Sequence, residues 1–196
     1  MIMYYTDALT DKKILLHACC GPCSLGAIEP LLSDGALITL FYYNPCIIDG
    51  EFERRLDALR TVAEHYSLPL VVPDHDYSAY LAYAEPYATD REGGARCGLC
   101  FADRLTSSAG YAFANGFDAF ATTLTVSPHK DSRRIFSIAD GISDKVGVPF
   151  LPRDFKKRDG FKLSCSLAAE LGIYRQRFCG CEFSQPEISA AGGGDK

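Results

Sequence analysis

The 196-residue sequence contains no apolar run long enough to span a membrane. The stretch from Met1 to Lys13 lacks the cationic start and apolar core of a secretion signal, so we expect a cytoplasmic protein with no membrane partner. No internal repeat is visible, which argues against a repeat architecture. The net charge of −5 gives no overall positive excess that would attract a nucleic acid.

Cysteine, in contrast, is abundant, with nine residues in the chain. A chain of this length with 47% hydrophobic residues buries a sufficient core without disulfides. We expect one domain over residues 1–184, followed by a disordered tail over 185–196. In a cytosolic chain, many cysteines indicate metal binding or catalysis rather than cross-links.

Charge is unevenly distributed along the chain. Residues 129–177 contain eleven Lys or Arg and six Asp or Glu, a net +5 that leaves −10 for the remainder. A basic segment on an acidic protein can face phosphates. The alternative is an ordinary solvated surface of mixed charge.

The first half of the chain alternates strand and helix patterns. The apolar run from Ile14 to Leu16 predicts a buried strand that Gly21-Pro22 ends, and Ser24 is expected to cap the following helix. Strands are predicted over 36–43 and 68–72, with a helix over 50–66 that Asp49 would cap. This order predicts an α/β fold with a doubly wound parallel sheet.

The second half continues the alternation after an interruption. Residues 74–96 are expected to form an irregular excursion or a short helix that positions Cys97. We predict a helix over 98–115, a strand over 117–123, a helix over 132–146, a short strand over 148–151, a basic loop over 153–162 and a helix over 164–171. The inward positions of the first of these helices are predicted to be Leu99, Leu105, Ala109, Ala112 and Phe113.

Seven cysteines fall into three tight groups, and the first group directly follows the first strand. The groups are Cys19, Cys20 and Cys23; Cys97 and Cys100; and Cys179 and Cys181. Ligands of open α/β sheets bind at the carboxyl ends of the strands, and thiolates there favour metal. Cys46 and Cys165 stand alone and are predicted to be small buried residues.

The number of thiols bears on the kind of metal centre. A zinc site takes four ligands, and so does a 4Fe-4S cluster. Seven thiols exceed one such set, so a second, mononuclear metal with an open position is favoured. Neighbouring Cys19 and Cys20 point in opposite directions in an extended chain and can serve different metals. One cluster with spare cysteines stays the alternative.

Four segments together carry a resemblance to a known family. They are His17-Ala-Cys-Cys-Gly-Pro-Cys23; residues 92–101, Glu-Gly-Gly-Ala-Arg-Cys-Gly-Leu-Cys-Phe, with Arg104-Leu105; residues 122–130, Thr-Thr-Leu-Thr-Val-Ser-Pro-His-Lys; and Asp154-Phe-Lys-Lys157 with residues 174–181, Tyr-Arg-Gln-Arg-Phe-Cys-Gly-Cys. The chain resembles the QueH-type epoxyqueuosine reductases over nearly the whole domain. This resemblance implies a Rossmann-like fold of the nucleotide α-hydrolase type. It also implies cobalamin-independent reduction of epoxyqueuosine to queuosine at the wobble base of tRNA.

The resemblance further implies a 4Fe-4S cluster beside a single metal ion, which we expect to be iron. All seven grouped cysteines, Cys19, Cys20, Cys23, Cys97, Cys100, Cys179 and Cys181, would belong to this centre. Some family members carry Asp at the position of Cys23, so Cys23 is the best candidate for the single metal. The other six are expected at the cluster, and their division stays open.

Removal of an epoxide oxygen takes two electrons, and a proton donor assists the departure of the oxygen. The cluster would relay electrons, the single metal would polarise the oxygen, and a ferredoxin- or flavodoxin-like protein is the expected electron donor. His17, Asp131 and Tyr174 are the predicted proton donors because they lie close to the motifs. A backbone partner for His17 and a core position for Tyr174 are the alternatives.

Contacts with tRNA are predicted in the basic segment and near the cysteines. The expected phosphate contacts are Arg96, Lys130, Lys156, Lys157, Arg175 and Arg177. Gln176 is expected to hydrogen-bond a base edge, and Tyr174 and Phe178 are expected to stack on bases. The wobble base would have to be splayed out of the loop to reach a metal.

Two other functions fit part of the pattern. A cluster-bearing tRNA thiolase would hold ATP with a Ser-Gly-Gly-x-Asp-Ser loop after the first strand, where this chain has Cys-Cys-Gly-Pro-Cys-Ser. A zinc-stabilised RNA-binding module would use the thiols without redox chemistry.

Overall fold

The computed structural model describes residues 9–184. The predicted tail, 185–196, and residues 1–8 lie outside the described residues, so the domain boundary stays a prediction. No helix within residues 9–184 is long and apolar enough to cross a membrane.

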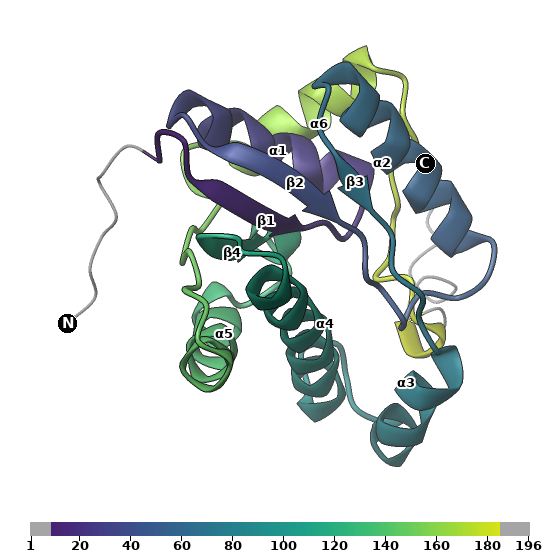
Figure 1. The fold of residues 1–196 in the computed structure, drawn as a ribbon. Helices are drawn as coiled ribbons and strands as arrows, with labels where there is room; N and C mark the ends of the chain where they lie inside the picture. The colour runs from purple at the N-terminus through teal and green to yellow at the C-terminus, as the bar shows by residue number, and fades with distance from the viewer. Residues whose placement is uncertain (1–8, 185–196) are drawn as a thin grey trace.

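A parallel sheet of four strands in the order β3-β2-β1-β4 forms the centre of the fold (Figure 1). The strands are β1 (Lys13–His17), β2 (Leu37–Phe41), β3 (Leu70–Val71) and β4 (Ala119–Thr122). β1 is interior, and its Leu15 pairs with Thr39 on one side and Phe120 on the other. Strand connectivity alternates with helices, which confirms the predicted α/β class.

Helices cover both faces of the sheet (Figure 1). The helices α1 (Gly21–Ser33), α2 (Glu51–His65) and α6 (Gly160–Glu170) lie on one face, and α4 (Ala95–Ala114) and α5 (Ser132–Val146) lie on the other. Successive strand side chains point to opposite faces, so Ile14 and Leu16 join the core under α1 while Leu15 joins the core under α4. The predicted doubly wound arrangement is therefore confirmed.

The fifth predicted strand, 148–151, is reduced to a single parallel bridge between Phe120 and Phe150. Pro149 has no N–H to donate and Pro152 follows directly, so a longer ladder cannot form. Residues 74–96, predicted as an excursion or short helix, contain α3 (Tyr77–Ala84), which Asp76 caps, and a 3-10 helix over Glu85–Tyr87.

Several helix boundaries and faces differ from the prediction. The cap of α1 is Cys20, whose sulfur accepts the N–H of Cys23 at 3.4 Å, because Ser24 lies inside the helix and donates to the Cys20 carbonyl. The cap of α2 is Gly50 rather than Asp49. Leu99 and Phe113 of α4 are 38% and 62% exposed rather than inward, since helix α4 turns Leu105, Ala109 and Ala112 to the sheet.

Helix α4 begins at Ala95, earlier than predicted, and so carries Cys97 and Cys100 in its first two turns. Short 3-10 helices span Thr123–Val126 after β4 and Glu182–Ser184 at the end of the described chain. The segment 174–181 runs past the edge at which the strand arrows end (Figure 1). This edge therefore brings together the loop after β1, the start of α4 and the C-terminal segment.

Candidate metal centre

Cys19, Cys20 and Cys23 form the tightest thiol group, with their sulfur atoms all within 4.8 Å of one another. Gly21 allows this turn to pack closely on α2, because a Cβ there would lie 2.6 Å from the Ala58 carbonyl oxygen. Thr123 fixes the turn on the other side: its hydroxyl accepts the N–H of Cys19 at 2.9 Å and donates to the Cys19 sulfur at 3.2 Å. The loop after β1 is thus held by both neighbours.

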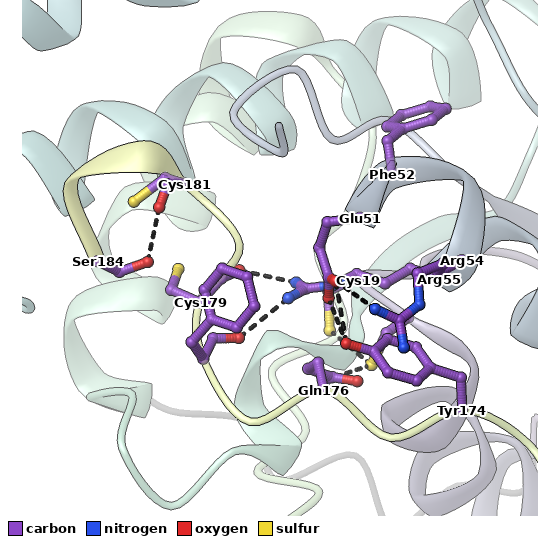
Figure 2. Close-up of polar contacts among 12 residues, drawn as sticks. Cys19, Glu51, Phe52, Arg54, Arg55, Tyr174, Gln176, Cys179, Cys181 and Ser184 are labelled. Atoms are coloured by element: carbon purple, nitrogen blue, oxygen red, sulfur yellow. Dashed lines mark hydrogen bonds and ion pairs between the residues drawn. The ribbon is translucent and has the colours of Figure 1, made fainter. Parts of the chain in front are cut away.

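The C-terminal segment lies against this group (Figure 2). The Gln176 side-chain amide donates to the Cys20 sulfur at 2.8 Å. Buried Arg55 donates to the carbonyls of Cys179 at 2.7 Å and Phe178 at 3.0 Å, and it pairs with Glu51 at 2.7 Å. Residues more than a hundred positions apart in the chain therefore meet at one thiol-lined edge.

The second predicted group, Cys97 and Cys100, lies at the start of α4. Cys100 is 8% exposed, and its proximity, together with burial, raises the pKa of Cys46, the cysteine that follows β2. The sulfur of Cys97 accepts the N–H of Gly93 at 3.3 Å, and burial, together with the nearby charge of Cys179, raises the pKa of Cys97. All nine cysteines are free thiols, so none of the predicted pairs is a disulfide.

Two cations lie among the thiols. Arg104 is 3% exposed and donates from Nε to Nε2 of His17 at 3.3 Å and from Nη2 to the side-chain oxygen of Asn44. Burial alone would lower the pKa of Lys130, but the nearby thiols of Cys179 and Cys19 raise it, so the ammonium stays charged. Both cations favour the thiolate form that binds metal.

The residues present fit a thiolate-bound metal centre. Beyond the clustered sulfurs, the side-chain oxygen of Gln176 is buried beside Cys20 and has no hydrogen-bond partner. A buried polar atom without a partner is costly in a complete site, and a bound group would satisfy it. Soft thiolate donors select iron, as in Fe–S clusters, zinc or copper(I) over magnesium or calcium.

The three predicted proton donors have different surroundings. His17 is fully buried, and its Nδ1 hydrogen-bonds the Thr122 hydroxyl at 2.8 Å. Burial and the charge of Arg104 lower the pKa of His17 to about 3, which favours a neutral ring that positions the loop after β1. Asp131 is exposed and caps α5 by accepting the N–H of Arg133. The Tyr174 hydroxyl donates to Glu51, with Oε1 at 3.0 Å and Oε2 at 2.9 Å (Figure 2).

The predicted phosphate contacts also differ in how exposed their side chains are. Arg96 is 3% exposed, and its guanidinium donates to the carbonyls of Tyr87 and Ala88, so the structure favours a supporting role for it. Lys156 is half-buried and donates to the Lys130 carbonyl at 2.7 Å. The exposed cations of the predicted set are Lys157, Arg175 and Arg177.

Cys165 was expected to be buried, but it is only half-buried, and its sulfur accepts from Arg175 at 2.9 Å. Cys46 is 1% exposed, as predicted. Glu51 and Arg55 were missed, although their spacing of four on a predicted helix was a visible signal. Arg104 and Asn44 were also missed as site residues, and only the long-range fold places them together.

Comparison with known proteins identifies the family. Residues 14–187 match the model of epoxyqueuosine reductase QueH. The chain is 34% identical to the epoxyqueuosine reductase QueH of Streptococcus pyogenes over 88% of this chain and 70% of that protein. It is 34% identical to the protein of that name from Thermotoga maritima over 87% of this chain and 89% of the relative.

Solved structures share the fold at low sequence identity. A predicted subunit of tRNA methyltransferase from Methanocaldococcus jannaschii superposes with a TM-score of 0.58 at 14% identity, covering 81% of this chain and 75% of that chain. The U34-tRNA thiolase NcsA from Methanococcus maripaludis, solved with its 4Fe-4S cluster, superposes with a TM-score of 0.57 at 15% identity over 93% of this chain and 65% of its own. These matches support the fold, and the sequence matches establish that the chain belongs to the epoxyqueuosine reductase QueH family.

Proposed function

We propose that this protein is an oxidoreductase that removes the epoxide oxygen of epoxyqueuosine in the tRNA anticodon loop to give queuosine. The names of the relatives support the substrate and the reaction. The structural observation that carries the proposal is the convergence of Cys19, Cys20 and Cys23 with Gln176 and the Cys179 segment at one edge of the sheet. Thiolates gathered there suit a redox-active iron centre.

The thiols would hold a 4Fe-4S cluster and one further metal ion, which we infer to be iron. When bound, these groups would supply single electrons and polarise the epoxide oxygen. Cys23 would serve the single metal, and the cluster would draw on Cys19, Cys20, Cys97, Cys100, Cys179 and Cys181. Electrons would come from a ferredoxin- or flavodoxin-like protein, and cobalamin would not be needed.

Departure of the oxygen as water consumes two electrons and two protons. Tyr174 is the best placed of the predicted donors, because its hydroxyl carries a proton and is held in position by the hydrogen bonds that it donates to Glu51. Neutral His17 would hold the loop after β1 in place. Asp131 would contribute only indirectly, by capping the first turn of α5.

The tRNA would bind across the same edge. Exposed Lys157, Arg175 and Arg177 would contact phosphates, and Gln176 with Tyr174 would meet the splayed wobble nucleotide. Lys130 would act mainly on the thiols that it faces. The anticodon loop would thereby be oriented by charge and the base by the residues around Cys20.

The proposal is tested with anaerobically purified protein, a chemical reductant and tRNA that carries epoxyqueuosine, with no cobalamin added. We expect iron and acid-labile sulfide in the protein and conversion of the nucleoside to queuosine. Zinc in place of iron, with tRNA binding but no conversion, would favour the RNA-binding module. ATP-dependent sulfur insertion would favour a thiolase.

A further inference from the structure

Gln176 points its side-chain amide toward the thiol group that follows β1 (Figure 2). Its Nε2 lies 2.8 Å from the sulfur of Cys20 and 4.0 Å from the sulfur of Cys23. A carboxamide nitrogen carries two N–H donors, whereas a thiolate can only accept. The amide therefore donates to Cys20 at short range and also faces Cys23.

The chain on both sides of Gln176 is fixed to α2. Before it, the Tyr174 hydroxyl donates to the two carboxylate oxygens of Glu51 at 3.0 Å and 2.9 Å. After it, Arg55, which is 3% exposed, donates to the carbonyl of Phe178 at 3.0 Å. With both flanks held, the amide has little freedom to turn away from the sulfurs.

The side chains around Gln176 alternate between the protein and the solvent. Gln176 is half-buried, whereas its neighbours Arg175 and Arg177 are exposed. Successive side chains of an extended chain point in opposite directions. The amide thus belongs to the thiol site, while the two cations remain on the outer side, where phosphates can reach them.

The free oxygen of this amide shows which form of Cys20 the arrangement suits. Within residues 9–184, the buried Oε1 of Gln176 has no hydrogen-bond partner. Turning the amide over would place this oxygen against the Cys20 sulfur, and a thiolate has no proton to offer it. The orientation found therefore suits a deprotonated Cys20, the form that binds metal.

We propose that Gln176 is a positioning residue of the metal centre, whose amide donates to the metal-bound sulfur of Cys20 and holds this ligand beside Cys23. The inference rests on the proposed metal centre and adds a residue that is not itself a ligand. Hydrogen-bond partners of metal ligands fix the orientation of the ligands, and their loss typically weakens metal binding by about 10- to 100-fold. Because the nitrogen faces sulfur, only the oxygen of the amide remains for a hydrogen-bond donor of the substrate.

The first test uses Co²⁺ as the probe, because thiolate-to-cobalt absorption reports sulfur ligands directly. Metal-free, reduced wild-type protein is titrated beside Gln176→Leu, which removes the amide at similar volume. The control Asn115→Leu removes an exposed amide just after the last residue of α4. For Gln176→Leu we expect an affinity about 10- to 100-fold lower and a charge-transfer band at longer wavelength, because a sulfur without its hydrogen bond gives up an electron more readily. Asn115→Leu should match the wild type in both.

A second measurement detects the hydrogen bond without a variant. The chain has two glutamines, Gln176 and Gln185, so wild-type protein with ¹⁵N-labelled glutamine gives few side-chain amide signals. When the protein holds ¹¹³Cd²⁺, an N–H that donates to a cadmium-bound sulfur shows a scalar coupling to the metal. We expect this coupling at one amide, the one whose signal is missing from Gln176→Leu.

Two results would overturn the inference, because either leaves Gln176 with only a packing role. They are the absence of the coupling in cadmium-loaded wild type, and weaker Co²⁺ binding by Gln176→Leu with an unmoved charge-transfer band. Failure of the wild type to bind either ion through sulfur would instead refute the proposed metal centre. No tRNA is present in these experiments, so their outcome is distinguishable from failure of the proposed reaction.

Discussion

At the scale of single residues, the buried cations explain why several thiolates can lie close together in a small volume. Arg104 contacts neutral His17 and Asn44, and the nearby charges that favour its protonated form are those of Cys46, Cys100 and Cys19. A buried charge needs a compensating partner, and here the partner is the thiol cluster itself. The guanidinium therefore stabilises added negative charge at the centre.

We expect Arg104→Gln to lower the reduction potential of the proposed iron centre, because a reduced centre carries one more negative charge. Arg104→Lys should retain more of the wild-type potential, and Arg158→Gln, an exposed control, should leave it unchanged. Redox titration followed by electron paramagnetic resonance measures all three. Equal potentials in the wild type and Arg104→Gln would contradict the proposed electrostatic role.

The lowered pKa of His17 leads us to predict that the free energy of unfolding depends on pH. Burial and Arg104 lower its pKa from 6.5 to about 3, so the unfolded chain binds a proton in this window that the folded chain does not. The stability that neutral His17 contributes is therefore present above pH 6.5 and falls as the pH drops towards 3, by about 1.4 kcal/mol per unit. Urea unfolding of metal-free wild type and His17→Gln should give a stability difference that shrinks with acidification; a constant difference would refute the assignment.

At the scale of elements, local patterns predicted the strands and helices well because apolar periodicity reports which face is buried. The contacts that build the centre are long-range and leave no such signal. The bond from Arg55 of α2 to the Cys179 carbonyl joins residues 124 positions apart. The cap of α1 was assigned to Ser24 because oxygen caps are common, whereas the sulfur of Cys20 takes that role.

Helix α2 holds the C-terminal segment through Arg55. Arg55→Ala would leave Glu51 buried without its partner and free two carbonyls, so we expect a loss of about 3–5 kcal/mol in the free energy of unfolding. The matched control on the same helix is Arg60→Ala, which removes an exposed pair with Asp57 and should cost at most about 1 kcal/mol. Similar losses from both substitutions would show that the segment is held by other contacts.

The exposed cations of the loop before α6 and of the C-terminal segment lead us to predict that tRNA binding depends on salt. Replacing Lys157 and Arg177 together by Glu should weaken binding and reduce the slope of log affinity against log salt by about 0.7 for each lost phosphate contact on a single-stranded loop. Lys12→Glu is the control, since Lys12 lies at the opposite end of β1 and pairs with Asp118. An unchanged slope in the double variant would mean that these cations are only solvated.

At the scale of the whole molecule, the sheet brings distant thiols together by its topology. Parallel strands with helices on both faces point every carboxyl end to one edge, and the chain returns there twice more, at the start of α4 and in residues 174–181 (Figure 1). The sequence predicted this meeting from the order of strands and cysteines.

The most direct test of the account is a single-turnover experiment under anaerobic conditions. Iron-loaded protein is reduced, excess reductant is removed, and tRNA carrying epoxyqueuosine is added. The account predicts that the nucleoside loses one oxygen atom by mass while the reduced centre is oxidised by two electrons per nucleoside converted. Oxidation without conversion, or conversion by protein that holds zinc and no iron, would contradict it.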